Sequence, residues 1–311
     1  MMKRTCLLRK LLALTLCLLL CGSALADTVR GDLTGRFEEP KTLERDGETY
    51  QYRRGLTTIL LMGIDTRLGY DDERVGYHNG GQSDFLLLLV LDKENKTITP
   101  IHINRDVMTE ITILGVLGDE AGTITTQLCL SHGFGDGKEE SCGYARDAVS
   151  RLLQGENIDF YLAMNLDGIS ELNDLVGGVT VTLEDDFSAL DPTMTKGKTL
   201  TLTGDQAEIF VRGRHSVGVG TNESRMVRQE QYMAELTTLM DAKQNEDADF
   251  VGTLYDALTP YLTTNMSRGR LINEAWAAKD YEREPVIKPE GVHEVGADGL
   301  RWMKHRYRKR C

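Results

Sequence analysis

The stretch FLLLLVLDKENKTITPIHIN, residues 85–104, contains two β-rich runs around a short polar loop. Residues 85–91 are continuously apolar, which indicates a buried strand. Residues 97–104 alternate between apolar and polar side chains and are rich in β-branched residues, which indicates a second strand. Because the five residues between them, 92–96, are polar, the two strands are predicted to form an antiparallel hairpin.

This hairpin predicts which residues face each other across the two strands. If Leu91 lies opposite Thr97, then Asp84 lies opposite Asn104 at the other end of the hairpin. A further apolar run over residues 58–64 precedes the hairpin and predicts a third buried strand.

Charged side chains cluster where these three strands begin or end. If the strand over residues 58–64 runs parallel to the one over 97–104, they meet at one edge of the sheet. Ligands of α/β proteins bind at the carboxyl ends of strands. Carboxylates are ligands for hard cations such as Mg²⁺, and arginine forks bind phosphate, so a metal and a phosphate are predicted together. The residues are Asp65, Arg67, Asp84, Arg105 and Asp106.

The rest of the chain alternates helical and strand patterns. Helices are predicted at about residues 144–153, 166–176 and 223–242, with another near Gly204, and a strand at residues 179–183. Strands mixed with helices predict a layered α/β/α domain with a central mixed sheet over residues 57–260.

A second basic group lies in residues 212–229 of a protein whose net charge is −12. The first two arginines are predicted on one side of an extended segment. The others share a helix face, expected to point away from Met226 and Met233. The alternative is a solvated face or ion pairs with the many acidic residues. The residues of this group are predicted to bind substrate, and they are Arg212, Arg214, Arg225, Arg228 and Gln229.

The N-terminus has the pattern of an export signal. Basic residues precede an apolar stretch at residues 11–21, and Ala24-Leu25-Ala26 follows as a small-residue cleavage site. Residues 1–26 are therefore predicted to be a cleaved signal peptide or a membrane anchor, and residues 27–56 a linker. The net negative charge argues against general binding to nucleic acid. Residues 261–311 form a C-terminal extension to which the sequence assigns no role.

Cysteine usage is consistent with export. Cys129 and Cys142 are the only cysteines between the N-terminal segment and Cys311 at the end of the chain. An oxidising compartment would allow Cys129 and Cys142 to form a disulfide, and two free thiols are the alternative. Neither the spacing nor the neighbouring residues indicate a zinc site.

Six segments, in this order, resemble the LytR-CpsA-Psr family. Together they extend over about residues 58–240, and their order makes the resemblance specific. They are LLMGIDTR (60–67), QSDFLLLLVLD (82–92), INRDVMTEI (103–111), IDFYLAMNLDGISELNDLVGGVTVTL (158–183), LTLTGDQAEIFVRGRH (200–215) and SRMVRQEQY (224–232).

The resemblance implies a phosphotransferase that attaches lipid-linked anionic glycopolymers, such as wall teichoic acid or capsule, to peptidoglycan. It implies Asp65 and Asp84 as ligands of Mg²⁺ (or Mn²⁺), and a hydrophobic pocket under the sheet for a polyprenyl chain. The protein would act at the extracellular face of the cytoplasmic membrane, anchored or secreted, and close to the membrane surface. The residues implied to bind pyrophosphate are Arg105, Arg212, Arg214, Arg225 and Gln229.

The chain departs from the family pattern at three positions. Gln82 stands where the family usually has arginine, Asn104 where it has proline, and Asn222 where it commonly has aspartate. Two other functions therefore stay open beside the transferase. One is hydrolysis of a lipid pyrophosphate, and the other is a non-catalytic protein that binds polyprenyl pyrophosphate or regulates the cell envelope.

Overall fold

The computed structural model describes residues 42–45, 47–51, 55–68, 80–214, 217–295 and 301–305. The chain divides after residue 54 into two units. In the first, β1 (Thr42–Arg45) and β2 (Glu48–Gln51) form an antiparallel hairpin. The predicted signal peptide or anchor lies outside the described residues. Among the described residues, no helix combines the length and apolarity needed to cross a membrane.

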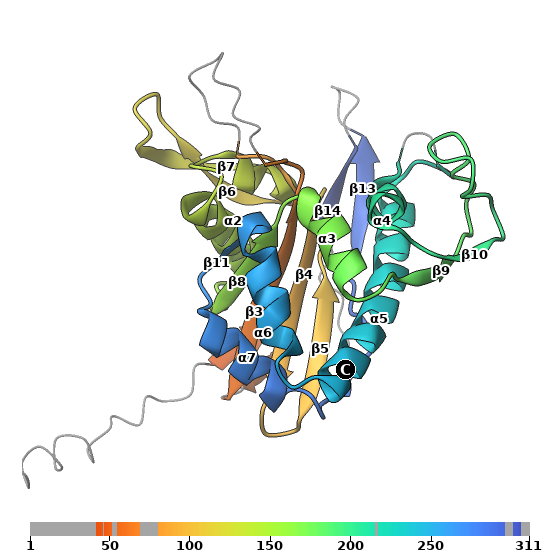
Figure 1. The fold of residues 1–311 in the computed structure, drawn as a ribbon. Coiled ribbons are helices and arrows are strands. Elements are labelled where there is room, and N and C mark those ends of the chain that lie inside the picture. The colour runs from red at the N-terminus through yellow and green to blue at the C-terminus, as the bar shows by residue number, and fades with distance from the viewer. Residues whose placement is uncertain are drawn as a thin grey trace, which may run out of the picture. The chain divides into compact units, whose positions relative to one another are not determined.

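The second unit is built on a six-stranded mixed sheet with the order β11-β8-β3-β4-β5-β12 (Figure 1). β3 pairs antiparallel with β4 and parallel with β8, and β4 pairs antiparallel with β5. β3 and β5 are therefore parallel, as predicted, and end at the same edge. The strands are β3 (Leu56–Ile64), β4 (Ser83–Asp92), β5 (Thr97–His102), β8 (Phe160–Met164), β11 (Leu262–Thr264) and β12 (Glu282–Arg283).

The β4–β5 hairpin is confirmed, but its predicted register is wrong by one residue. Leu91 pairs with Ile98, and Thr97 pairs with Asp92. Asp92 stays in the ladder because its Oδ1 accepts hydrogen bonds from the backbone N–H groups of the next turn, at 3.0 Å from both Glu94 and Asn95. The loop thus has four residues instead of five.

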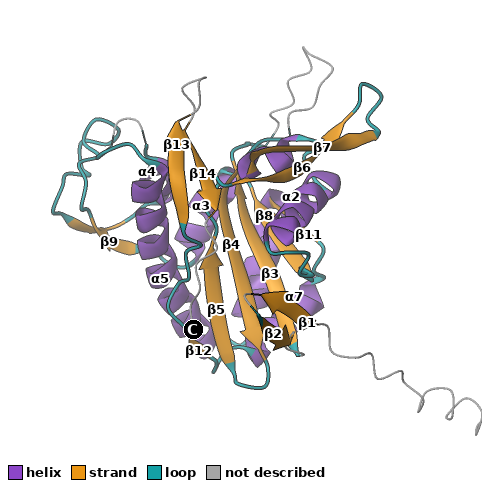
Figure 2. Cartoon of the chain, turned by 180° about the vertical axis from the view of Figure 1, so that it is seen from behind, coloured by secondary structure: helices purple, strands orange, loops and turns teal. Residues whose placement is uncertain are grey.

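Helices cover both faces of the sheet, which gives the predicted three layers (Figure 2). On one face α2 packs with a small sheet and a 3-10 helix, and on the other α3, α5, α6 and α7 gather. The first group is α2 (Glu139–Leu152), β6 (Met108–Leu114), β7 (Glu120–Gln127) and η1 (Leu128–Gly133). The second is α3 (Asp167–Leu175), α5 (Asn222–Glu246), α6 (Phe250–Leu258) and α7 (Arg268–Ala277).

Alternation along β4 divides its leucines between the two faces. Leu86 and Leu88 are buried in the core under α2. Leu87, Leu89 and Leu91 line a cavity on the opposite face. The run of apolar residues that predicted a buried strand thus belongs to a strand covered on both sides.

Residues after 260 complete the central sheet, so residue 260 is not a domain boundary. β11 pairs with β8 at one edge, and β12 pairs with β5 at the other. The remaining elements are β9 (Thr180–Thr182), β10 (Thr199–Thr201), α4 (Gly204–Arg212), η2 (Thr259–Tyr261), β13 (Gly291–Val295) and β14 (Arg301–His305).

Candidate functional site

A β-bulge at the start of β4 directs Asp84 into the site. Gly63 of β3 pairs with Phe85, and Ile64 pairs with Ser83, so Asp84 has no opposite residue in this ladder. Bulges re-aim side chains next to active sites, and here Asp84 and Phe85 both line the cavity although they are consecutive. A Cβ at Gly63 would lie 3.1 Å from Cβ of Phe85, so glycine permits this close approach.

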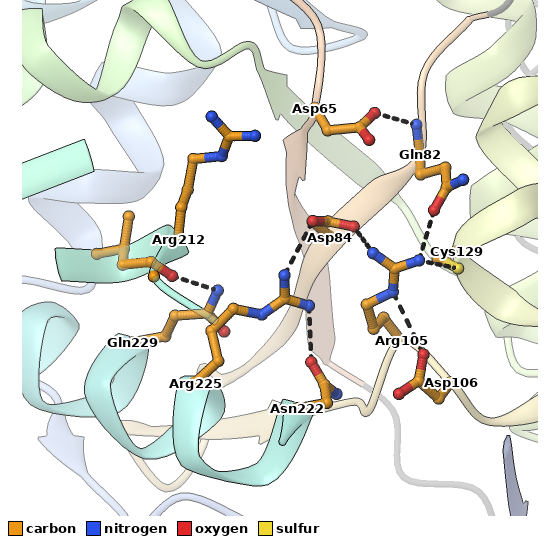
Figure 3. Close-up of polar contacts among 12 residues, drawn as sticks. Asp65, Gln82, Asp84, Arg105, Asp106, Cys129, Arg212, Asn222, Arg225 and Gln229 are labelled. Atoms are coloured by element: carbon orange, nitrogen blue, oxygen red, sulfur yellow. Dashed lines mark hydrogen bonds and ion pairs between the residues drawn. The ribbon is translucent and has the colours of Figure 1, made fainter. Parts of the chain in front are cut away.

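Two arginines bind the two carboxylate oxygens of Asp84 (Figure 3). Arg105, in the turn after β5, donates from Nη1 to Oδ1. Arg225, in the first turn of α5, donates from Nη1 to Oδ2 at 3.0 Å. Guanidinium groups bind carboxylate and phosphate oxygens with the same planar fork. Asp84 therefore occupies donors that a phosphate group can also use.

Arg105 is held by three further side chains. Its Nη2 donates to Oε1 of Gln82 at 2.5 Å and to Sγ of Cys129 at 2.9 Å. Its Nε lies 3.4 Å from Oδ1 of Asp106. These contacts orient the guanidinium toward Asp84. Arg105 and Asp84 are therefore close together, as predicted, although the predicted register was off by one residue.

The N-terminus of α5 adds to the positive character of the site. Thr221 caps the helix, and its side-chain oxygen accepts a hydrogen bond from the backbone N–H of Ser224 at 3.3 Å. Arg225 therefore lies in the first turn, where the helix dipole favours anions.

Buried positive charge accumulates around Arg225. The pKa of its guanidinium is lowered to about 10, first by burial and then by the positive charges of Arg105 and Arg214, whereas Asp106 opposes this. Within the described part of the chain, the buried Nε atoms of Arg225 and Arg214 have no hydrogen-bond partner. Unsatisfied buried donors are costly, so an anionic ligand would stabilise this arrangement.

An apolar cavity of about 720 Å³ extends from the arginines between the sheet and α5. It reaches along β4 from Asp84 to Leu91, a length of about 24 Å at roughly 3.4 Å per residue. The hydrophobic pocket that the resemblance implies is therefore present. Its apolar walls include Leu61, Leu87, Leu89, Ile98, Leu162 and Met233.

Asp65 lies beside this cluster, at the end of β3 (Figure 3). Its Oδ1 accepts a hydrogen bond from the backbone N–H of Gln82 at 2.5 Å, and its own N–H donates to the carbonyl of Gln82 at 3.1 Å. Both predicted metal ligands thus lie at the predicted edge of the sheet. In the described residues, no group of three or more His, Cys, Asp or Glu side chains forms a metal site.

Arg67 and Arg212 bind one shared carboxylate. Arg67 donates to Oε1 of Glu208 at 2.6 Å and to Asp167 at 2.7 Å, and Arg212 donates to the same Oε1 at 2.8 Å. Arg212 lines the cavity, whereas Arg67 is half exposed. The prediction of an extended segment at Arg212 is wrong, because this residue ends helix α4.

Arg228 differs from the other arginines on α5. It pairs with Asp185 at 2.9 Å, donates to the carbonyls of Phe210 and Gly213, and stacks on the ring of Phe187. All three donor nitrogens are thus used within the protein. The predicted substrate-binding role does not fit this geometry, which indicates that Arg228 anchors α5 to the segment after α4.

Gln229 and Arg225 line the same cavity as Met233, one helix turn apart in sequence. The prediction that the polar face of α5 points away from Met233 is therefore wrong. The Nε2 of Gln229 donates to the carbonyl of Val211 at 3.3 Å, and its buried Oε1 has no hydrogen-bond partner among the described residues.

The two cysteines of the domain are free and buried, so the disulfide alternative is wrong. Cys129 contacts Arg105, whereas Cys142 lies 3.6 Å from Nε2 of His132. Burial raises the pKa of Cys129 to about 11 and that of Cys142 to about 12. Both are therefore neutral thiols at physiological pH.

One polar pair in the cavity wall lies outside the predicted set of site residues. His102 of β5 lines the cavity, and its Nδ1 lies 3.0 Å from Oε1 of Glu230, which also pairs with Lys288 at 2.8 Å. Strand alternation places His102 on the same face as Ile98, and this signal was available in the sequence. Glu230 was not identifiable, because helix periodicity alone does not reveal its neighbour on another element.

The sequence matches a known protein family. The family model described as LytR_cpsA_psr family matches residues 32–292. The chain is 26% identical over 291 residues to the polyisoprenyl-teichoic acid–peptidoglycan teichoic acid transferase TagU of Bacillus cereus (strain ATCC 14579), covering 91% of this chain and 87% of the relative. It is 27% identical to the same-named protein of Bacillus mycoides (strain KBAB4), covering 78% and 71%.

Solved structures share the fold. Protein gbs0355 of Streptococcus agalactiae superposes with a TM-score of 0.66 at 22% identity, covering 80% of this chain and 82% of that one. A structure described as TagT bound to LI-WTA gives a TM-score of 0.61 at 19% identity, covering 87% and 92%.

Proposed function

The chain belongs to the LytR_cpsA_psr family, and on this basis we propose that it transfers an anionic glycopolymer from a polyprenyl pyrophosphate carrier to peptidoglycan. The observation that supports this most directly is the position of the arginine pair on Asp84 at the head of an apolar cavity. A ligand with a charged head and a long apolar tail matches both parts. The names of the relatives, which are teichoic acid transferases, agree with this proposal.

Pyrophosphate binds by replacing Asp84 as the anion that the arginines contact. Arg105 and Arg225 donate to the two oxygens of Asp84, so their donors converge on one position. The Nε atoms of Arg225 and Arg214, which have no hydrogen-bond partner among the described residues, are further donors. Gln229 and Arg212 line the same end of the cavity. Bidentate arginine contacts neutralise phosphate oxygens and orient the group for reaction.

The reaction is a displacement at the phosphorus on the glycan side. A peptidoglycan sugar hydroxyl attacks this phosphorus, and its bond to the bridging oxygen breaks, so that polyprenyl phosphate leaves with the bonding electrons. Arg105 and Arg225 stabilise the charge that develops on the phosphate oxygens. Asp84, released from its arginines by the substrate, accepts the proton of the attacking hydroxyl on one carboxylate oxygen, which leaves the other oxygen available to a metal ion.

The proposal includes Mg²⁺, or Mn²⁺ in its place, held by Asp65 and Asp84. Mg²⁺ is usually bound by one or two carboxylates together with substrate phosphates, so two carboxylates at one edge of the sheet fit a metal that arrives with pyrophosphate. When bound, the metal would neutralise phosphate charge and act as a Lewis acid.

Attack by a peptidoglycan hydroxyl implies that the protein acts outside the cytoplasm, at the extracellular face of the membrane. The apolar cavity takes the part of the polyprenyl chain next to the pyrophosphate, which leaves the rest in the bilayer. The N-terminal basic and apolar residues are consistent with export, whether they are cleaved or retained as an anchor. Peptidoglycan is then the nearest acceptor, and wall teichoic acid or capsule is the donor glycan.

The test measures two products from a lipid-linked glycopolymer. Release of polyprenyl phosphate together with glycan on peptidoglycan supports transfer, whereas glycan free in solution indicates hydrolysis. Asp84→Asn and added chelator should each abolish release. Asp256→Asn, which changes an exposed carboxylate paired with Arg268, should not. Lipid binding without release in any condition would overturn the proposal in favour of a non-catalytic binding protein.

A further inference from the structure

Two buried asparagines connect the turn that carries Arg105 with the helix that carries Arg225. Asn104 precedes Arg105 directly, and Asn222 lies one turn before Arg225 on α5. The Nδ2 of Asn222 donates to Oδ1 of Asn104 at 2.8 Å, and both side chains are buried.

Only one orientation of the two amide groups satisfies their neighbours. Oδ1 of Asn222 accepts from Nη2 of Arg225 at 2.7 Å, and a guanidinium group can only donate. Oδ1 of Asn104 accepts from the backbone N–H of Asp106 at 2.9 Å, which also can only donate. The amide of Asn222 must therefore present its N–H to Asn104.

We infer that Asn104 and Asn222 form a neutral bridge that positions Arg225 for the anionic head of the substrate. They are positioning residues, because they act through the arginine and contact no reacting atom. The inference rests on the proposed function in one respect, namely that the anion is a pyrophosphate carrying a prenyl chain.

The neutrality of the bridge has a consequence for Arg225. Its two Nη atoms contact one carboxylate, Asp84, and one amide, Asn222. An amide satisfies the donor without cancelling the charge, so the positive charge stays available for an incoming phosphate. The amide also satisfies Asn104, because it can donate as well as accept.

The substitution Asn222→Asp therefore tests the bridge directly. It keeps an acceptor for Arg225, but its other oxygen faces Oδ1 of Asn104, so that two acceptors meet without a proton between them. Turning the amide of Asn104 does not help, because its Nδ2 would then face the N–H of Asp106. Removing the opposed acceptor by Asn104→Ala should relieve the conflict.

The experiment measures the dissociation constant of farnesyl pyrophosphate by calorimetry for the parent, Asn222→Asp, Asn104→Ala and the double variant. We expect Asn222→Asp to weaken binding by about tenfold or more, since a contact to a charged group is disturbed. The double variant should bind more tightly than Asn222→Asp. Such a rescue does not arise from general damage, because a second substitution would then add to the loss.

Asn265→Asp is the matched control. Its amide also bridges two groups, accepting from the N–H of Tyr161 at 2.9 Å and donating to the carbonyl of Asp159 at 3.0 Å, but it lies at an exposed position outside the site. Its dissociation constant should equal that of the parent.

Three results would overturn the inference: parent-like binding by Asn222→Asp, a double variant that binds no better than Asn222→Asp, or no binding of farnesyl pyrophosphate by the parent. The proposed function is tested separately, by glycan transfer in the same proteins. If the parent transfers no glycan but the binding series behaves as expected, the bridge stands and the transferase proposal fails.

Discussion

Arg105 offers the most direct test of the site at the scale of one residue. Arg105→Ala removes a charge-assisted contact and should weaken binding of a polyprenyl pyrophosphate by about 2–3 kcal/mol. Arg105→Lys should recover only part of this loss, because an ammonium group cannot contact Asp84, Gln82 and phosphate with a planar fork. Equilibrium binding in detergent micelles measures both.

Arg268→Ala provides the control, since this arginine forms an exposed ion pair with Asp256 away from the cavity. Its affinity should match the parent. If Arg105→Ala binds as tightly as Arg268→Ala, the assignment of Arg105 to the pyrophosphate is wrong.

The buried thiols lead to a prediction about pH. Because burial raises the pKa of Cys129 to about 11 from 9.0, folding keeps the thiol protonated after the unfolded chain has begun to ionise. This contribution to stability is complete below about pH 9 and is lost as the pH rises toward 11. Cys129→Ser, whose hydroxyl does not ionise in this range, should show a smaller loss of unfolding free energy between these pH values in chemical denaturation.

Arg225 and Arg228 show why the sequence could not distinguish an arginine of the site from one with a structural role. They share a helix face, and spacing predicts that they act together. In the structure Arg228 donates hydrogen bonds to Asp185 and to two backbone carbonyls, whereas Arg225 donates to Asp84. Those partners come from distant segments, so periodicity along the helix cannot reveal them.

The contacts of the three residues that depart from the family pattern can be read only from the three-dimensional structure. Gln82 contacts Arg105, and Asn222 contacts both Arg225 and Asn104. The three positions are spread over 140 residues of sequence but belong to one hydrogen-bonded group. Read one at a time, they suggested lost function, whereas the structure places all three around the two arginines.

At the scale of an element, the β3–β4 ladder depends on Gly63 beside the bulge. Gly63→Ala brings a Cβ to 3.1 Å from Cβ of Phe85, so the strand must shift where Asp84 is positioned. We expect the unfolding free energy to fall by about 1–3 kcal/mol, as for other overpacked sites, and pyrophosphate affinity to fall with it. Denaturant titration and calorimetry give the two values.

Gly143→Ala is the opposite case in α2. A Cβ there meets no atom within 4 Å, so alanine should stabilise the helix by about 0.5–1 kcal/mol and leave affinity unchanged. If Gly63→Ala leaves pyrophosphate affinity as unchanged as Gly143→Ala does, the bulge does not control the position of Asp84.

The strands themselves were easier to predict than the register between them. The apolar runs and the polar loop identified β3, β4 and β5, because burial and turn formation follow from local composition. The register of β4 and β5 was off by one, since the side chain of Asp92 shortens the loop through hydrogen bonds to Glu94 and Asn95. A single slip of this kind reverses which face each side chain occupies.

For the whole molecule, the cavity separates recognition of the head from recognition of the tail. Leu89→Trp places a large ring in the middle of the cavity. We expect it to weaken binding of a long polyprenyl pyrophosphate by about 1 kcal/mol or more, as apolar burial is lost, while the affinity for inorganic pyrophosphate stays at the parent value.

Ile124→Trp is the control, because Ile124 is exposed on β7 and does not line the cavity. Both ligands should bind it as they bind the parent. A loss of inorganic pyrophosphate binding in Leu89→Trp would mean that head and tail sites are not separate.

The edge strands from the last part of the chain also determine the order in which the protein can finish folding. The β5 edge stays open until residues 282–283 have emerged, and the Thr99–Glu284 contact beside it closes a loop of 185 residues. Such distant pairing is slow, and an open strand edge is a template for association with other chains. A chain shortened after residue 281 should therefore aggregate during refolding, whereas one shortened after residue 305 should stay monomeric in light scattering. If the chain is exported as proposed, the interval between translocation and the arrival of the C-terminal segment is the time at which it is most exposed to aggregation.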